Sequence, residues 1–247
     1  MLKMHSVYAK YALAALVLVA VLLSFVALAA PKVSAGNLYA GNLHMHTDCS
    51  DGEDSYDAMV EESVRLGFRF IAITDHNFCP NYIERCRNET RILCIPSMEF
   101  TTPNWHMLAI GIAKNPAEEE CIGAPGPGPC DGGLSLQETV RRVHAQGGLA
   151  IAAHPANGLP NKINAQDLPL FDAMECDHPS YGLAQGLETI MLRNGAPIPC
   201  VYDSDAHNAE SLGVMYSVCG LDNLTEEGVK AAIVGNKCRQ SGLLAGI

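Results

Sequence analysis

The sequence is poor in basic residues, with 16 Lys and Arg against 27 Asp and Glu and a formal net charge of −11. An acidic chain lacks the positive field that attracts a polyanion, so extended binding to duplex DNA or RNA is disfavoured. Two catalytic motifs are also missing. Because the sequence has no Gly-x-Ser-x-Gly elbow and no phosphate-binding P-loop, neither serine-hydrolase chemistry nor ATP-driven chemistry is indicated.

Cysteines spaced as Cys-x-x-Cys are absent too, so neither a structural zinc knuckle nor a thioredoxin-type site is supported. The sequence nevertheless has 10 cysteines, all placed after an apolar N-terminal run. An even and high number in an exported chain suggests disulfides, which an oxidising compartment preserves. Cys121 and Cys130 flank a loop rich in Pro and Gly and form the most natural local pair, whereas the sequence leaves the other pairings open.

The N-terminus carries a targeting signal. Lys3 and Lys10 precede residues 11–30, an uncharged run rich in Ala, Leu and Val, and small residues follow it. This order is typical of a signal peptide, while the length of the run also suits an uncleaved membrane anchor. We expect residues 1–35 to form an apolar helix with one of these roles. Residues 36–247 should then form one extracytoplasmic domain, secreted or anchored to the membrane.

Short apolar runs alternate with helical patterns in the rest of the chain, which predicts an α/β fold. Strands are expected at 70–74, 149–153, 173–175 and 200–202. Helices are expected at 55–66, 135–147, 182–192 and from Thr225 to about Val234. The segment 114–133 has few apolar residues and reads as a surface loop.

Residues able to bind metal ions follow several of these predicted strands. His76 follows the strand at 70–74, His154 follows the strand at 149–153, and Asp205 and His207 follow the strand at 200–202. The carboxyl ends of parallel strands share one face, so these side chains should meet there. Imidazole together with carboxylate suits zinc, iron and manganese better than calcium or magnesium.

Five segments of the sequence carry a family resemblance. They are Leu43-His-Met-His-Thr-Asp-Cys-Ser-Asp-Gly52, Ile73-Thr-Asp-His-Asn77, Pro96-Ser-Met-Glu99 with His106-Met-Leu-Ala-Ile-Gly111, Ala153-His-Pro155, and Ser204-Asp-Ala-His207. In these segments the chain resembles the polymerase and histidinol phosphatase (PHP) domain family, and in particular its small stand-alone phosphoesterases. The resemblance implies a distorted barrel of about seven β/α units that holds two or three divalent ions (Mn, Zn or Fe).

The same resemblance implies a set of metal ligands. The set is His44, His46, Asp51, His76, Glu99, His106, His154, Asp205 and His207. His44, His46, Glu99 and Asp205 would hold the first ion, and Glu99 would bridge to a second ion bound by His106 and His154. Asp51, His76 and His207 would hold the third ion. Of the other histidines, His144 is expected within a helix and outside the site, and His178 in a loop near the pocket.

Adjacent cations activate a water molecule and offset the charge that develops in a phosphoryl displacement. We therefore predict hydrolysis of a phosphate monoester or a small phosphodiester, with no covalent enzyme intermediate. Glu99, Asp205 and His207 would lie closest to the chemistry, and His207, His178 or a metal-bound water would protonate the leaving group. Substrates would be small phosphorylated molecules, including nucleotides and short oligonucleotides. The alternatives are an amidohydrolase-like reaction on a C–N bond and a non-catalytic metal-binding module.

Overall fold

The computed structural model describes residues 37–77, 79–117, 134–155, 163, 166–179 and 198–242. All of them belong to a compact unit that spans Asn37–Ile247. The predicted N-terminal apolar helix, the predicted helix at 182–192, the Cys121 and Cys130 pair and most of the 114–133 loop lie outside the described residues. No helix in the described part is long and apolar enough to cross a membrane.

One sheet has five strands in the order β10-β9-β1-β2-β3. Their bounds are β1 Asn37–Asn42, β2 Phe70–Ile71, β3 Leu93–Cys94, β9 Tyr216–Leu221 and β10 Cys238–Ser241. β1 pairs in parallel with β2, with Gly41 opposite Phe70, and in antiparallel with β9. A Cβ atom at Gly41 would lie 2.4 Å from Phe70. Glycine therefore permits the close approach of these two strands.

The other sheet has the order β4-β5-β6-β7-β8. Its strands are β4 Ser97–Thr101, β5 His106–Ile110, β6 Leu149–Ala152, β7 Ala173–Glu175 and β8 Cys200–Val201. β5 is antiparallel to both of its neighbours, β4 and β6, whereas β6, β7 and β8 run in parallel. The carboxyl ends of β6, β7 and β8 consequently lie at one edge, as the sequence predicts for the strands that precede His154 and Asp205.

The strands of the described residues do not close into one barrel, and the prediction of a seven-unit barrel is confirmed only as a mixed α/β fold. Antiparallel β4–β5 and β9–β10 pairs interrupt the alternation of strand and helix. Isolated parallel bridges, Met45 with Ala206 and His76 with Glu99, connect residues after β1 and β2 to residues after β8 and within β4. The two sheets therefore meet at the ends that carry the predicted ligands.

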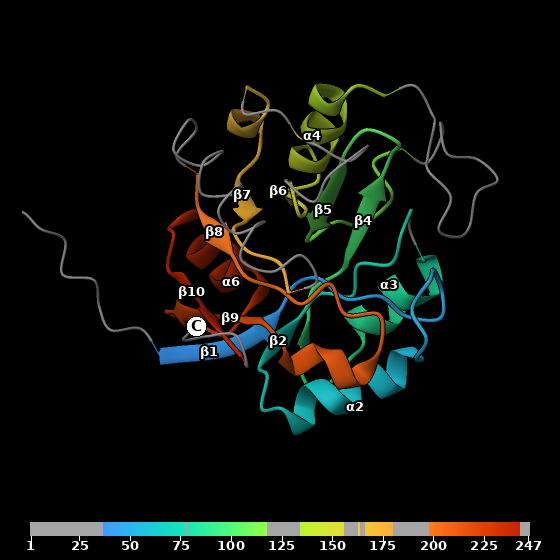
Figure 1. Cartoon of the computed structure of the whole chain (residues 1–247), viewed down its shortest axis with the longest axis vertical. Coiled ribbons are helices and arrows are strands. Elements are labelled where there is room, and N and C mark those ends of the chain that lie inside the picture. The colour runs from blue at the N-terminus through green and yellow to red at the C-terminus, as the bar shows by residue number, and fades with distance from the viewer. Residues whose placement is uncertain are drawn as a thin grey trace, which may run out of the picture. The chain divides into compact units, whose positions relative to one another are not determined.

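Three of the helices begin within one residue of their predicted starts, each at a side-chain cap. The bounds of the helices are α2 Tyr56–Arg65, α3 Pro80–Arg87, α4 Leu136–His144 and α6 Glu226–Val234, with short 3-10 helices η1 Leu168–Leu170 and η2 Ala209–Gly213. The hydroxyls of Ser55, Ser135 and Thr225 accept hydrogen bonds from backbone N–H groups in the first turns of α2, α4 and α6. Figure 1 shows α4 beside β4, β5 and β6. Helix α3, which no sequence pattern predicted, starts at a proline.

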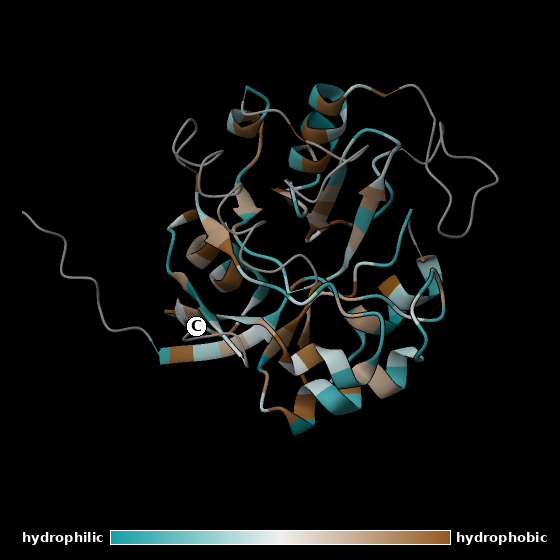
Figure 2. Ribbon diagram, in the orientation of Figure 1, coloured by the Kyte–Doolittle hydropathy of each residue, from teal (hydrophilic) through white to brown (hydrophobic). Residues whose placement is uncertain are grey.

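Strand β5 shows how the core is built. Its alternate residues Met107 and Ala109 pack in a cluster with Val140 and Val143 of α4, while Leu108 and Ile110 pack in a second cluster with residues of both sheets. Figure 2 shows the corresponding mixture of hydrophobic and hydrophilic residues on the helices. Because β5 is buried on both faces from Met107 to Ile110, that part of its sequence is an unbroken apolar run rather than an alternating one.

Four disulfides join the described cysteines. The pairs are Cys49–Cys79, Cys86–Cys94, Cys176–Cys200 and Cys219–Cys238. No free cysteine occurs in the part of the chain that the structure describes. This pairing fits the disulfides that the even cysteine count predicts.

Candidate metal centre

The structure brings all nine predicted ligands together. His44, His46, His76, His154, Asp205 and His207 follow strands, Glu99 and His106 lie on β4 and β5, and Asp51 lies on the loop before α2. Their donor atoms form overlapping groups suited to metal ions: His46, Asp51, His76 and His207; His44, His46 and Glu99; His44, His154 and Asp205; Glu99, His106 and His154. Residues distant in sequence thus converge on a single site.

Four donor atoms form the most buried part of the site. His44 Nε2 lies 3.1 Å from His46 Nε2, 3.3 Å from Glu99 Oε2 and 3.1 Å from Asp205 Oδ1. His46 Nε2 lies 3.3 Å from Glu99 Oε2 and 3.1 Å from Asp205 Oδ1. Ligands 2.0–2.1 Å from a tetrahedral ion are about 3.3–3.4 Å from one another. The four atoms are therefore spaced to surround one ion.

The hydrogen bonding of these atoms also fits a cation. Glu99 Oε2 and Asp205 Oδ1 are buried and have no hydrogen-bond partner among the described residues, and the same holds for His46 Nδ1. Buried polar atoms without a partner are costly and rare in folded proteins. A divalent ion would satisfy both oxygen atoms at once, so the donor set fits the metal that the PHP resemblance implies.

Glu99 presents its two carboxylate oxygens to different histidines. Oε1 lies 2.9 Å from His106 Nδ1 and 3.1 Å from His154 Nε2, whereas Oε2 faces His44 and His46. One carboxylate therefore contacts two separate groups of nitrogen donors, which is the arrangement that a bridging ligand requires.

The third group of ligands is more open to solvent. Asp51 Oδ2 lies 3.4 Å from both His76 Nε2 and His207 Nε2. The side chains of Asp51 and His207 are 33% and 38% exposed, whereas those of His44 and His46 are fully buried. His76 is oriented by Thr101, whose hydroxyl lies 2.5 Å from His76 Nδ1. The exposed ligands mark the side from which a substrate can approach.

Proton binding in the cluster is strongly perturbed. Burial alone would lower the pKa of His46, but Asp205 and Glu99 raise it to about 10. Burial likewise opposes the charged form of His44, yet Glu175, Asp205 and Glu99 raise its pKa well above the usual value. The cluster therefore has a high affinity for positive charge. A metal ion has to displace these protons, because only the unprotonated nitrogen is a ligand.

Glu175, which the sequence pattern places only on a strand, contacts two of the predicted ligands. It is the last residue of β7 and is 1% exposed. Its Oε1 lies 2.7 Å from His44 Nδ1, and because a carboxylate only accepts, Nδ1 donates and Nε2 is left free to bind a metal. Its Oε2 accepts the backbone N–H of His154 at 2.6 Å. The only available signal was its place at a strand end.

The hydrogen bond from the backbone N–H of His154 to Glu175 supports an unusual backbone conformation. His154 and Asp205 have φ angles of 29° and 49°, a region that side-chain-bearing residues rarely adopt. Such conformations persist where surrounding interactions hold them and they cluster at functional sites. Glu175 therefore fixes both the ring of one predicted ligand and the backbone of another.

His178 and Asp203 complete the buried surroundings. His178 lies in a loop, as the sequence favoured; its side chain is 2% exposed and its Nε2 lies 3.1 Å from Asp205 Oδ2. Asp203 accepts the backbone N–H of Leu43 at 2.8 Å. Burial, together with the charge of Glu175, raises the pKa of Asp203 to about 8. His178 thus orients Asp205, and Asp203 holds the segment that begins with Leu43.

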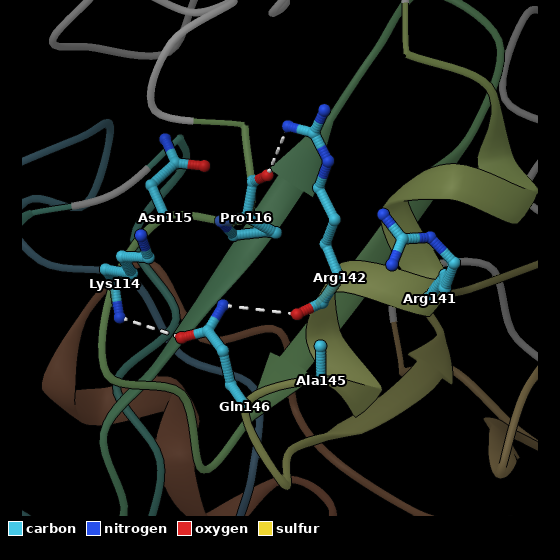
Figure 3. A pocket seen from close by; sticks show the side chains of 7 residues that line it. All are labelled: Lys114, Asn115, Pro116, Arg141, Arg142, Ala145 and Gln146. Atoms are coloured by element: carbon cyan, nitrogen blue, oxygen red, sulfur yellow. Dashed lines mark hydrogen bonds between the residues drawn. The ribbon is translucent and has the colours of Figure 1, made fainter.

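A hollow of about 390 Å³ lies away from this cluster (Figure 3). Lys114, Arg141 and Arg142 line it, and both arginines pair with Glu138. None of the predicted ligands lines the hollow. The described start of the predicted 114–133 loop therefore borders this separate depression.

Comparisons with known proteins identify a matching family. The model of the PHP domain family matches residues 42–115, a segment that contains His44, His46, Asp51, His76, Glu99 and His106. No curated protein matches the sequence.

Solved structures share the fold at low sequence identity. A two-domain protein from Bacteroides vulgatus, with a predicted PHP-like metal-dependent phosphoesterase, is 17% identical with a TM-score of 0.66, over 86% of this chain and 67% of that one. An amidohydrolase from Chromobacterium violaceum is 17% identical with a TM-score of 0.54, over 70% and 89%. The lesion-specific endonuclease Q from Pyrococcus furiosus is 15% identical with a TM-score of 0.60, over 81% and 56%. The resemblance to the PHP family is therefore confirmed, by sequence over residues 42–115 and by fold over most of the chain.

Proposed function

We propose that this protein is a metal-dependent phosphoesterase that hydrolyses small phosphate monoesters or diesters. The observation that carries the proposal is the set of five distances of 3.1–3.3 Å among His44 Nε2, His46 Nε2, Glu99 Oε2 and Asp205 Oδ1. This spacing fits one divalent ion, and the donor atoms around Glu99 Oε1 fit a second. Divalent ions supply Lewis-acid stabilisation of a phosphoryl group and lower the pKa of water.

The residues have distinct proposed roles. His44, His46, Glu99 and Asp205 hold the first ion, Glu99 with His106 and His154 holds the second, and Asp51, His76 and His207 hold the third. Glu175 keeps His44 in the tautomer that binds metal, since it accepts the Nδ1 proton. His178 orients Asp205 from the buried side. His207 is the better placed of the two histidines to give a proton to a leaving group, because it is 38% exposed while His178 is 2% exposed.

The size and charge of the substrate follow from the same features. A net charge of −11 disfavours long polyanions, because the chain as a whole repels them. Bound cations reverse the sign of the field within the site, so a small phosphate ester is still attracted there. Nucleotides and short oligonucleotides remain within this class, and the fold shared with an endonuclease supports their inclusion among the candidates.

The test is hydrolysis of p-nitrophenyl phosphate and bis(p-nitrophenyl) phosphate by purified protein. We expect release of nitrophenol with Mn²⁺ and none after EDTA treatment, and the preferred ester separates monoesterase from diesterase action. A folded protein that contains metal but cleaves neither ester would contradict the proposal.

Hydrolysis of a C–N bond is the second candidate, since an amidohydrolase shares the fold. The same ions can polarise a carbonyl group and activate water against it. Turnover of amide or cyclic amide substrates by metal-loaded protein that leaves both phosphate esters intact would favour this candidate. Protein that binds metal and turns over neither class would instead be a metal-binding module.

We also propose that the domain works outside the cytoplasm, secreted or held by the N-terminal segment. The four disulfides support this location, because the cytosol keeps most thiols reduced. Cell fractionation with an antibody against the domain tests the location, and recovery from the cytoplasm with free thiols would contradict it.

A further inference from the structure

The Cys49–Cys79 disulfide lies beside the most exposed part of the candidate metal centre. Cys49 precedes Asp51 by two residues and Cys79 follows His76 by three. The disulfide thus joins the two chain segments that carry two of the three ligands proposed for the third ion. By contrast, the Cys219–Cys238 disulfide joins β9 to β10, and neither of its cysteines lies near a predicted ligand in sequence.

Asp51 is less firmly enclosed than the ligands of the first ion. Its carboxylate is 33% exposed and lies 3.4 Å from the nearest nitrogens of His76 and His207. The four atoms around the first ion are spaced at 3.1–3.3 Å, and the residues that carry three of them are at most 1% exposed. Asp51 therefore depends more on the loop that carries it than on packing around its own side chain.

Hydrogen bonds attach one side of that loop to the residue before His76. The backbone N–H and the hydroxyl of Thr47 each donate to Asp75 at 2.7 Å, and the hydroxyl of Ser50 also donates to Asp75 at 2.7 Å. These bonds position Thr47 and Ser50, and they would remain if the disulfide were absent.

The first turn of α3 attaches the other side of the loop. Tyr82 donates its hydroxyl hydrogen to Asp48 at 2.8 Å, and Cys79, the residue before α3, forms the disulfide with Cys49. The exposed pair Asp48 and Cys49 is thereby tied to the start of α3. Of these two attachments, only the disulfide is covalent and independent of competition from water.

We propose that the Cys49–Cys79 disulfide is a positioning element that sets the affinity of the third ion by holding Asp51 within reach of His76 and His207. The inference rests on the proposed metal centre. Without the disulfide, the loop samples more conformations, and ordering it again on ion binding lowers affinity. The first and second ions are unaffected, because their ligands lie on strands or directly after them.

Metal stoichiometry provides the test. The full chain and its Cys49→Ala/Cys79→Ala variant are titrated with Mn²⁺ by calorimetry, and bound metal is counted by elemental analysis after dialysis. We expect three ions in the wild type, and in the variant two tight ions with a third weakened about 10- to 100-fold, the range typical for residues that position ligands. Cys219→Ala/Cys238→Ala is the matched control and should bind three. Asp51→Asn, with the disulfide intact, should show the same loss as the first variant.

Four outcomes would overturn the inference. Unchanged affinity for all three ions in the Cys49→Ala/Cys79→Ala variant would show that the hydrogen bonds to Asp75 suffice. Loss of every ion, or failure to fold, would make the disulfide a general support of the fold. A wild type that binds only two ions would remove the third site and leave the proposed phosphoesterase activity standing. A wild type that binds no Mn²⁺ would refute the proposed function as well.

Discussion

Replacing Glu175 by glutamine tests how the first ion is held. The change keeps the shape of the side chain but replaces one accepting oxygen by a donating NH₂ group. Glu175 now accepts from both His44 Nδ1, at 2.7 Å, and the backbone N–H of His154, at 2.6 Å. Glutamine has one accepting oxygen and cannot satisfy both groups.

The backbone N–H of His154 can only donate, so the glutamine oxygen should stay with it. The NH₂ group then faces His44 Nδ1, which must become an acceptor. The ring proton of His44 would move to Nε2, the atom that lies 3.1 Å from Asp205 Oδ1 and 3.3 Å from Glu99 Oε2. A protonated Nε2 is no longer a ligand, and the first ion loses one of its donors.

The expected loss of affinity for the first ion is about 10- to 100-fold, as is usual for a carboxylate that orients a ligating histidine. This corresponds to roughly 1.4–2.7 kcal/mol. Removal of the Glu175 charge also lowers the pKa of Asp203, although burial still raises it above its usual value. Calorimetric titration with Mn²⁺ measures the affinity, and the dependence of ester hydrolysis on Mn²⁺ concentration measures it independently.

Glu138→Gln is the matched control, because it makes the same chemical change on a residue outside the cluster, whose carboxylate pairs with Arg141 and Arg142. It should leave metal affinity unchanged. If Glu175→Gln binds Mn²⁺ within twofold of the wild type while remaining folded, the assignment of the His44 tautomer is wrong.

Further predictions concern metal content, the place of His144 outside the site, and pH. Glu99→Ala should remove metal and activity together, and turnover with full metal content would refute its bridging role. His144→Ala should leave kcat/KM nearly unchanged, since His144 is 42% exposed and pairs with Asp172; a large loss would place it in the site. His46, with a pKa raised to about 10, contributes stability that is fully present below its unfolded pKa near 6.5 and is lost as pH rises toward 10. Asp203, with a pKa raised to about 8, likewise contributes stability that is lost as pH rises from its unfolded pKa to about 8. Thermal denaturation in EDTA should therefore show a Tm that falls from pH 6.5 to 9. The affinity for Mn²⁺ should rise over the same interval, because fewer protons have to be displaced. A flat Tm or a falling affinity would contradict these pKa shifts.

The sequence predicted the parts of this structure that depend on local patterns. The caps at Ser55, Ser135 and Thr225 begin helices, and β7 has the predicted bounds. The strand-end motifs predicted that four of the ligands would meet, since parallel strands of a sheet present those ends together. The full set of nine was implied by the resemblance to the PHP family. Local pattern was sufficient for the helix starts and strand bounds because each of them depends on residues within one helix or strand.

Other features depend on which atoms meet in space. The pairing of Cys49 with Cys79, 30 residues away, has no signal in spacing. Glu175 became significant only when His44 turned its second nitrogen toward it. The antiparallel β4–β5 pair also escaped prediction, because the sequences of its strands carry no mark of direction. Tertiary geometry, which periodicity does not encode, decided all three.

The placement of the ligands on both sheets has a consequence for how the protein matures. His44 lies near the start of the domain sequence and His207 near its end, yet both contact Asp205. Contacts between such distant segments form late and slowly, because a long loop must close first. A chain crossing a membrane or still on the ribosome has only part of the donor set. The protein should therefore acquire its metal after folding, in whatever compartment it folds, and the metal supply of that compartment would decide which ion it carries.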